Sequence, residues 1–250
     1  MNICLFDEAE ISKPLSFDDK RAEHLLTVLH KKQGDDFTAG IIGGQSGVAT
    51  ITRVDEAARQ IFFEFSATGD GKPLNPLKMI VGFPRPIQLR RLLRDVAALG
   101  VSELHLTGTE LGEKSYMQSD LAQPEAAREL LLEGTVQAGS THVPEVFVHK
   151  SLHIAVPEAL EGPHKQQLIC LDNINPACSL GEVQFSADMP VVAAIGSERG
   201  WTDKERILLE QVGFTRCGMG SRIMRTETAA TVAGAIILNS MGRLSGQARQ

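Results

Sequence analysis

Hydrophobic and polar positions follow two different patterns along this chain. In the first part, residues 22–30 (AEHLLTVLH) place apolar residues in a short helical pattern. Three strand-like runs follow, over residues 37–44, 47–54 and 60–67, and glycines mark bends within and between them. Short strands broken by glycines predict a small β-barrel rather than a helical unit.

A polar stretch rich in glycine and proline, residues 66–76, separates this part from the rest. Beyond it, short apolar runs alternate with amphipathic ones. The runs predict strands over 78–83, 101–106, 144–148, 167–171 and 191–195, with helices over 87–99 and 125–138. This alternation indicates a mainly parallel α/β sheet. We therefore expect a small β domain over residues 1–70 and an α/β domain over residues 71–250.

Two glycine-rich turns lie close together near the C-terminus, GSERG at 196–200 and GMGSR at 218–222. Between them, Thr202 and Glu205 form a capping-box pair that predicts a helix start, and Gly213 predicts its end. After the second turn, one apolar helical face is predicted: Ala229, Val232, Ala233, Ile236, Ile237, Ser240 and Met241. We expect the two turns to follow adjacent strands, at the sheet edge where open α/β sheets bind ligands.

Composition and charge narrow the class of protein. The chain has 250 residues with 42% hydrophobic and 22% charged residues, which is typical of a globular protein with a real core. No apolar run is long enough to span a bilayer, and the acidic N-terminus MNICLFDEAE is unlike a signal peptide. The four cysteines form no CxxC pair, which favours reduced thiols in a cytoplasmic protein. The net charge of −6 counts against broad electrostatic binding of RNA, although a local basic patch is compatible with it.

The turns are the best candidates for chemistry, and each also has a purely structural interpretation. The first turn lacks the GxGxxG and GxxxxGK[ST] spacings, so a tight strand-to-helix turn is the alternative to a ligand site. In the second, Thr226 or Thr228 is positioned to cap the last helix, whose N–H groups also suit a ligand.

The other candidate groups are weaker. His149 and His153 lie in a β-like context without a third ligand, so no metal site is expected. The basic cluster of Arg85, Arg90, Arg91 and Arg94 is either a solvated helix face or a phosphate contact.

The C-terminal motifs resemble those of the SPOUT methyltransferases, and within them the RsmE family, which methylates N3 of a uridine in small-subunit ribosomal RNA. That family has a GPEGG turn, a glycine-phenylalanine pair and the motif LGxRxLRxETAA. Here residues 196–200 read GSERG, residues 213–214 read GF, and residues 219–230 read MGSRIMRTETAA. Weaker likenesses to the family's N-terminal HLxxVLR…GD motif extend the resemblance over nearly the whole chain.

The resemblance implies a PUA-like β-barrel that binds RNA over residues 1–70, followed by a SPOUT-type α/β domain with a C-terminal trefoil knot. It also implies a homodimer that acts on ribosomal RNA or the small ribosomal subunit, with no membrane and no metal. The implied cofactor is S-adenosylmethionine, bound mainly by backbone groups. The matching cofactor-binding positions are Leu171, Ile195, Gly196, Gly200, Met219, Gly220, Arg222, Ile223 and Met224.

Methylation at a uracil N3 requires removal of a proton that is held firmly at neutral pH, so a base or a group that stabilises the anion is expected. Arg225 is the candidate that stabilises developing negative charge or holds phosphate. Glu198 is a candidate base or substrate-orienting group. Glu227 is the third catalytic candidate, or else fixes Arg225 by an ion pair.

The chain also departs from the family pattern. Ser197 and Arg199 replace a proline and a glycine of the first turn, and His30 replaces an arginine of the N-terminal motif. Residues 109–115 lack the arginine of the family's ERS motif. Most of the losses are basic residues that suit RNA, so two alternatives stay open: a SPOUT methyltransferase with another RNA target, or a non-catalytic dimeric SPOUT module.

Overall fold

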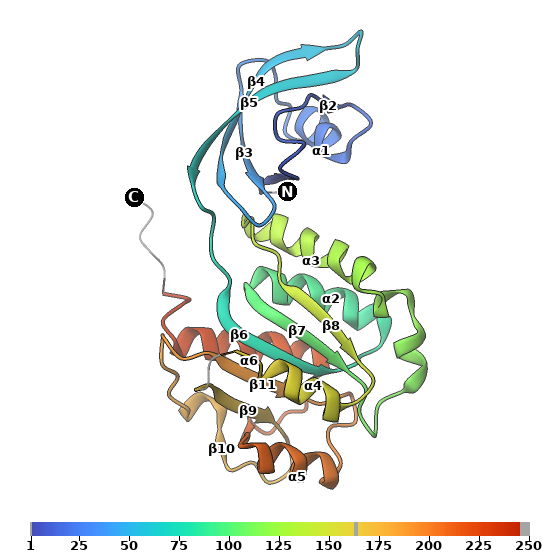
Figure 1. Ribbon diagram of the computed structural model, residues 1–250, viewed down its shortest axis with the longest axis vertical. Coiled ribbons are helices and arrows are strands. Elements are labelled where there is room, and N and C mark those ends of the chain that lie inside the picture. The colour runs from blue at the N-terminus through green and yellow to red at the C-terminus, as the bar shows by residue number, and fades with distance from the viewer. Residues whose placement is uncertain (1, 163–164, 246–250) are drawn as a thin grey trace. The chain divides into compact units, whose positions relative to one another are not determined.

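The computed structural model describes residues 2–162 and 165–245, and it divides into two compact units (Figure 1). The first unit comprises Met1–Pro73 and Thr135–Val143, and the second comprises Leu74–Gly134 and Pro144–Gln250. The later segment of the first unit has no counterpart in the division expected from the sequence. Residues 1 and 246–250, the outer ends of the two predicted domains, lie outside the described residues.

The first unit is built on a five-stranded sheet in the order β1-β3-β4-β5-β2. Its strands are β1 (Cys4–Phe6), β2 (Leu15–Ser16), β3 (Asp36–Ile41), β4 (Ser46–Asp55) and β5 (Gln60–Gly69). The predicted strand-like runs therefore form β3 to β5, which pair antiparallel. The predicted helix is α1 (Lys20–Glu23) followed by a π-helical turn, η1 (His24–Val28). Leu25 of that turn is buried in the unit's core.

The second unit contains a seven-stranded, wholly parallel sheet in the order β10-β12-β9-β11-β6-β7-β8. Its strands are β6 (Asn75–Gly82), β7 (Val101–Thr107), β8 (Glu145–His149), β9 (Gln167–Leu171), β10 (Cys178–Ser179), β11 (Val191–Ile195) and β12 (Thr215–Gly218). Its helices are α2 (Pro86–Ala98), α3 (Pro124–Ala138, whose residues from Thr135 on belong to the first unit), α4 (Leu152–Ala159), α5 (Asp203–Val212) and α6 (Thr226–Ser240), with 3-10 turns η2 (Lys114–Gln118), η3 (Asp120–Ala122) and η4 (Leu180–Glu182). The predicted α/β fold with a preceding small β domain is confirmed.

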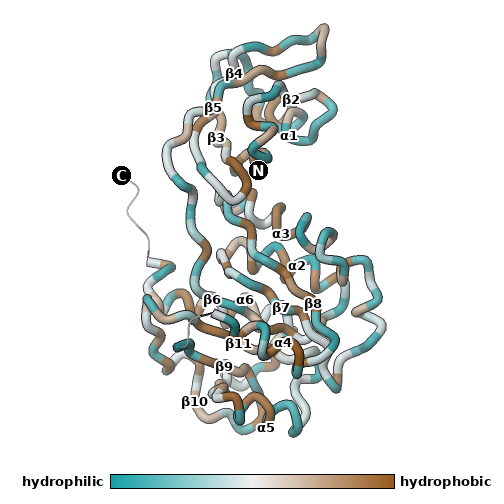
Figure 2. The backbone as a smooth tube through the Cα atoms, viewed as in Figure 1, coloured by the Kyte–Doolittle hydropathy of each residue, from teal (hydrophilic) through white to brown (hydrophobic). Residues whose placement is uncertain are grey.

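Helices cover both faces of the parallel sheet, so its central strands are apolar on both sides. All five residues of β11 are buried, and Figure 2 shows hydrophobic residues gathered along the central strands. On one face, Ile80 and Val192 pack with residues of α4 and α5. On the other face, Gly234 of α6 lies so close to Met79 that an added Cβ would come within 2.8 Å of its Cε.

The strands that carry the two turns are not adjacent, so that prediction is wrong. Leu171, at the end of β9, pairs with Ile195 on one side and with Cys217 on the other. β9 therefore lies between β11 and β12. The lengths and apolar character of these runs carry no information about strand order, because every parallel neighbour makes the same kind of ladder.

The helix signals near the turns have mixed outcomes. The capping box is confirmed, since Thr202 Oγ1 accepts from Glu205 N at 3.3 Å while Glu205 Oε2 accepts from Thr202 N at 2.9 Å. Gly213 ends the helix with φ of +105°, as predicted. The predicted apolar face of α6 is partly shifted. Ala233, Ile237 and Met241 are buried as predicted, whereas the other four predicted positions are half-buried and the neighbouring Gly234 and Leu238 are buried instead. Small residues such as Gly234 allow α6 to approach the sheet closely. A prediction that follows only the large apolar side chains does not identify them as part of the buried face.

Over the residues that the structure describes, no helix has both the length and the apolar character needed to span a membrane.

Candidate functional site

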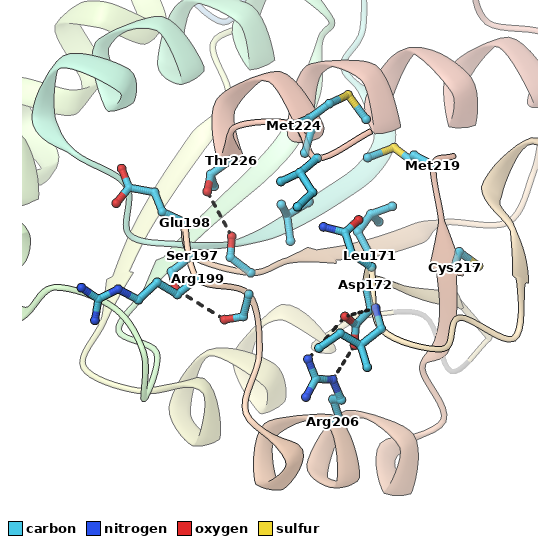
Figure 3. Close-up of a pocket in the computed structure, with 17 residues that line it drawn as sticks. Leu171, Asp172, Ser197, Glu198, Arg199, Arg206, Cys217, Met219, Met224 and Thr226 are labelled. Atoms are coloured by element: carbon cyan, nitrogen blue, oxygen red, sulfur yellow. Dashed lines mark hydrogen bonds and ion pairs between the residues drawn. The ribbon is translucent and has the colours of Figure 1, made fainter. Parts of the chain in front are cut away.

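A cavity of about 270 Å³ opens where β9, β11 and β12 end, and Figure 3 shows the side chains around it. Its walls come from three loops and from the start of α6. Of the residues predicted from the sequence, those that line it are Leu171, Ile195, Gly196, Glu198, Gly200, Met219, Ile223 and Met224. Gly220, Arg222, Arg225 and Glu227 are not among its lining residues.

The first turn closes on itself tightly, so a side chain at its start would crowd its end. Gly200 N donates to Ser197 O at 2.8 Å. A Cβ on Gly196 would lie 3.0 Å from Gly200 Cα, closer than nearly all real Cβ contacts. Gly200 itself has φ of +73°, a conformation that glycine adopts without strain. Gly196 and Gly200 therefore bring backbone to the cavity, and Ser197, Glu198 and Arg199 of the same turn also line it.

Trp201 fixes the base of this turn, and sequence reasoning missed it. Its ring is 2% exposed, and its Nε1 donates to Leu171 O at 3.0 Å. This hydrogen bond joins the residue that follows the first turn to the end of β9, so Leu171 and the turn form one wall. The signal was present in the sequence, because this is the chain's single tryptophan and it directly follows the glycine turn.

Thr226 joins the two turns directly. Its hydroxyl is buried and donates to Gly196 O at 3.3 Å (Figure 3). The N-cap position of α6 is Arg225, which makes no side-chain capping bond. The predicted capping of this helix by Thr226 is therefore wrong: its hydroxyl holds the first turn against the helix that follows the second.

An ion pair closes the opposite side of the cavity from Met219 and Met224 (Figure 3). Arg206 Nε lies 2.6 Å from Asp172 Oδ2, and the Asp172 side chain is only 4% exposed. The hydrogen bond to Asp172 raises the pKa of Arg206 above its ordinary value. Sequence reasoning missed this pair. One indication of it is present in the sequence, an aspartate directly after the predicted strand at 167–171.

Glu198 is the one catalytic candidate among the cavity's lining residues. Its side chain is 36% exposed, and its Oε1 lies 3.6 Å from Arg85 Nε. Arg85 also donates to Tyr116 Oη at 2.9 Å. The predicted basic cluster is thus divided, because Arg94 pairs with Glu133 on the surface while Arg85 reaches the first turn.

The remaining polar candidates lie beside the cavity. Arg222 and Arg225 are exposed, and neither forms an ion pair with any described residue. Glu227 is 5% exposed, and its Oε2 has no hydrogen-bond partner within residues 2–162 and 165–245. The ion pair expected between Arg225 and Glu227 is therefore not formed. The buried Oε2 of Glu227 lacks the partner that such groups normally have.

Cys217 lines the cavity, but its thiol is unsuited to nucleophilic chemistry. Burial raises its pKa to about 12, and the nearby Cys178 thiol, with Sγ 3.4 Å away, acts in the same direction. A thiol with this pKa is protonated at neutral pH. The cavity therefore offers backbone groups, apolar walls and carboxylates, without a cysteine nucleophile.

His149 and His153 do not come together. His149 ends β8 and is buried, whereas His153 is exposed on α4. His149 Nε2 instead lies 2.9 Å from His105 Nδ1, and His105 Nε2 lies 3.2 Å from Glu103 Oε2. Burial lowers the pKa of both histidines below the ordinary value. Among the described residues, no group of three or more potential ligands is arranged for a metal ion.

Known proteins match the chain over most of its length. Residues 71–238 match a family described as RNA methyltransferase domain. The chain is 43% identical to the ribosomal RNA small subunit methyltransferase E of Treponema pallidum, over 95% of this chain and 91% of that protein. It is 30% identical to the ribosomal RNA small subunit methyltransferase E 1 of Borreliella burgdorferi, over 96% of this chain and 98% of that protein.

Solved structures share the fold. A ribosomal RNA small subunit methyltransferase E from Neisseria gonorrhoeae bound to S-adenosyl methionine has a TM-score of 0.76 at 23% identity, over 96% of this chain and 97% of that one. A probable rRNA-methyltransferase from Porphyromonas gingivalis has a TM-score of 0.79 at 18% identity, over 97% and 99%. These structures show the shared fold, and the sequence matches establish the family. The chain belongs to the ribosomal RNA small subunit methyltransferase E family of RNA methyltransferases.

Proposed function

We propose that this protein transfers a methyl group from S-adenosylmethionine to N3 of a uridine in small-subunit ribosomal RNA. The observation that carries the proposal is the cavity lined by the two glycine turns, in a chain 43% identical to a ribosomal RNA small subunit methyltransferase E. The family relationship supplies the reaction class, and the cavity supplies a place for the cofactor.

The residues around the cavity fit this cofactor. A neutral adenine requires apolar walls and a few backbone hydrogen-bonding groups. Leu171, Ile195 and Met224 supply such walls, and Gly196 also lines the cavity. Glu198 places a partly exposed carboxylate beside a cavity whose ligand carries a positive sulfonium. Met219, Gly200 and Ile223 are further proposed contacts that line the cavity. Gly220 and Arg222 of the second turn are proposed to contact the cofactor as well.

When bound, S-adenosylmethionine supplies an electrophilic methyl group. The protein's part is to hold the acceptor and to promote loss of its N3 proton. We assign Glu198 as the base or orienting group because it lines the cavity. Arg225 follows the cavity-lining Met224 and stabilises negative charge on the base or its phosphate. Glu227, with its unpartnered buried oxygen, is the third candidate.

The proposal extends to the fold's finer features and to the protein's assembly. After β12 the chain returns across the ends of β9 and β11 to place α6 beside β6, a path that supports a C-terminal trefoil knot. Half-buried Val232 and Ile236 on α6, and Ile223 at 83% exposure, support a homodimer. Residues 1–70 are the proposed PUA-like RNA-binding domain, and the cytoplasm is the proposed location.

Thermal unfolding with and without S-adenosylmethionine tests the cofactor assignment. Ligand at about a hundred times Kd stabilises a folded protein by about 2.7 kcal/mol, so the expected result is an upward shift of Tm that grows with ligand concentration. Without such a shift, the enzymatic proposal and the cavity's assignment both fail. Size-exclusion chromatography with light scattering tests the homodimer, for which twice the chain mass of 27.1 kDa is expected.

A further inference from the structure

A second cavity of about 270 Å³ lies at the carboxyl ends of β6, β7 and β8. Phe83 and Met117 give it apolar walls, and Thr109 contributes a hydroxyl. Lys114 and Lys150 contribute two ammonium groups. Each of the three strands thus supplies a lining residue just beyond its end, which is the usual position of ligand-binding residues in an open α/β sheet.

This cavity opens on the same sheet edge as the first, because β6 lies between β11 and β7. Gly82 at the end of β6 touches the first turn, where an added Cβ would lie 2.4 Å from Ser197 N. Arg85 connects the first glycine turn, which lines the first cavity, to η2, which lines the second. Its Nε donates to Tyr116 Oη at 2.9 Å and lies 3.6 Å from Glu198 Oε1. Tyr116 belongs to η2, which also provides Lys114 and Met117.

Three polar side chains of this cavity have no hydrogen-bond or ion-pair partner among the described residues that would compete with a ligand. Thr109 Oγ1 is buried and has no hydrogen-bond partner in the described part of the chain, although such groups are nearly always paired. Neither Lys114 nor Lys150 forms an ion pair with a described residue. The nearby Glu113 is engaged locally, because its Oε1 accepts from Ser115 N and Oγ.

We propose that this second cavity receives the acceptor nucleotide, an unpaired pyrimidine nucleotide of the RNA substrate; the inference rests on the proposed function. Enzymes that modify a base draw it out of the stack into a pocket. A pyrimidine ring suits the walls of Phe83 and Met117, and its hydrogen-bonding edge suits the free hydroxyl of Thr109. Lys114 and Lys150 bind the flanking phosphates. The position beside Glu198 brings the base to the border of the cofactor cavity.

Methylation kinetics on small ribosomal subunits from a strain lacking the modification test this assignment. The Lys114→Ala/Lys150→Ala variant is expected to raise KM for subunits about tenfold or more. It is also expected to flatten the dependence of log affinity on log salt by about 0.7 to 0.9 for each phosphate that the variant no longer binds. Isothermal titration should give an unchanged Kd for S-adenosylmethionine. Lys204→Ala, an exposed lysine on α5 outside both cavities, is the matched control.

Thr109→Val tests the hydroxyl without changing the side chain's shape. It should lower kcat/KM for subunits several-fold, again with unchanged cofactor binding and an unchanged far-ultraviolet circular dichroism spectrum. If the parent protein methylates subunits and these variants match it in KM and salt dependence, the second cavity is not the acceptor site. If the parent binds S-adenosylmethionine but methylates no ribosomal RNA, the proposed function fails, and this inference falls with it.

Discussion

The buried hydroxyl of Thr226 donates a hydrogen bond to the carbonyl of Gly196, thirty positions earlier in the chain. One bond thereby couples the start of α6, which follows the second glycine turn, to the backbone of the first. Residues of both turns line a single cavity. Their relative position therefore depends on an interaction between residues distant in sequence.

Thr226→Val removes this bond while it keeps the side chain's size. Loss of one partner leaves a buried carbonyl unpaired, at a cost of about 1 to 3 kcal/mol. We expect a lower Tm and a Kd for S-adenosylmethionine raised about tenfold, measured by thermal melting and isothermal titration. Thr228→Val, at an exposed position of the same helical turn, is the control and should leave both quantities unchanged.

Gly82→Ala tests how closely the first turn rests on the sheet. A Cβ at this position would lie 2.4 Å from Ser197 N, so the turn must move away from β6. Cofactor binding measured by isothermal titration should weaken strongly, while secondary structure measured by circular dichroism is retained. Gly69→Ala is the control, because nothing lies within 4 Å of the added Cβ there. Equal cofactor affinity in the two variants would show that the turn tolerates displacement.

Asp172→Ala removes the buried carboxylate partner of the Arg206 guanidinium and leaves it only the exposed Asp203. Arg206 is 10% exposed, and removal of one partner of a buried ion pair typically costs about 3 kcal/mol or more. We expect a lower free energy of unfolding in urea and weaker cofactor binding. Asp203→Ala removes a carboxylate that is 94% exposed and contacts the same arginine, so it should have little effect. Similar losses in the two variants would contradict a special role for Asp172.

Sequence patterns predicted the local features of this site well, and its long-range contacts poorly. The capping box of Thr202 and Glu205 and the helix stop at Gly213 depend on residues a few positions apart, so spacing alone reveals them. The insertion of β9 between β11 and β12 depends on pairing between distant segments. The pair of Asp172 and Arg206 depends on this order as well. No periodicity encodes this strand order, so Leu171 was assigned to the cavity only through the resemblance.

The buried histidines make stability depend on pH. Burial holds the pKa of His105 and His149 below the ordinary 6.5 in the folded chain, and unfolding restores it. Below about pH 6.5 the unfolded chain binds protons that the folded chain does not, so the free energy of unfolding should fall as pH falls. The slope is at most about 1.4 kcal/mol per pH unit for each histidine.

Urea titrations between pH 8 and pH 5 measure this effect. The His105→Gln/His149→Gln variant should show a flatter pH dependence than the parent. His153→Gln, at an exposed position, should keep the parent's slope. An unchanged slope in the double variant would assign the pH dependence to other groups.

The most direct measurement is methyl transfer to small ribosomal subunits from a strain that lacks the modification. The purified protein is incubated with these subunits and deuterated-methyl S-adenosylmethionine, and the nucleosides of the extracted RNA are separated by mass spectrometry. The expected product is labelled 3-methyluridine at one position per subunit, lost in the Thr226→Val/Gly82→Ala variant. Unlabelled RNA in the presence of bound cofactor, or label on a base other than uracil, would contradict the assignment.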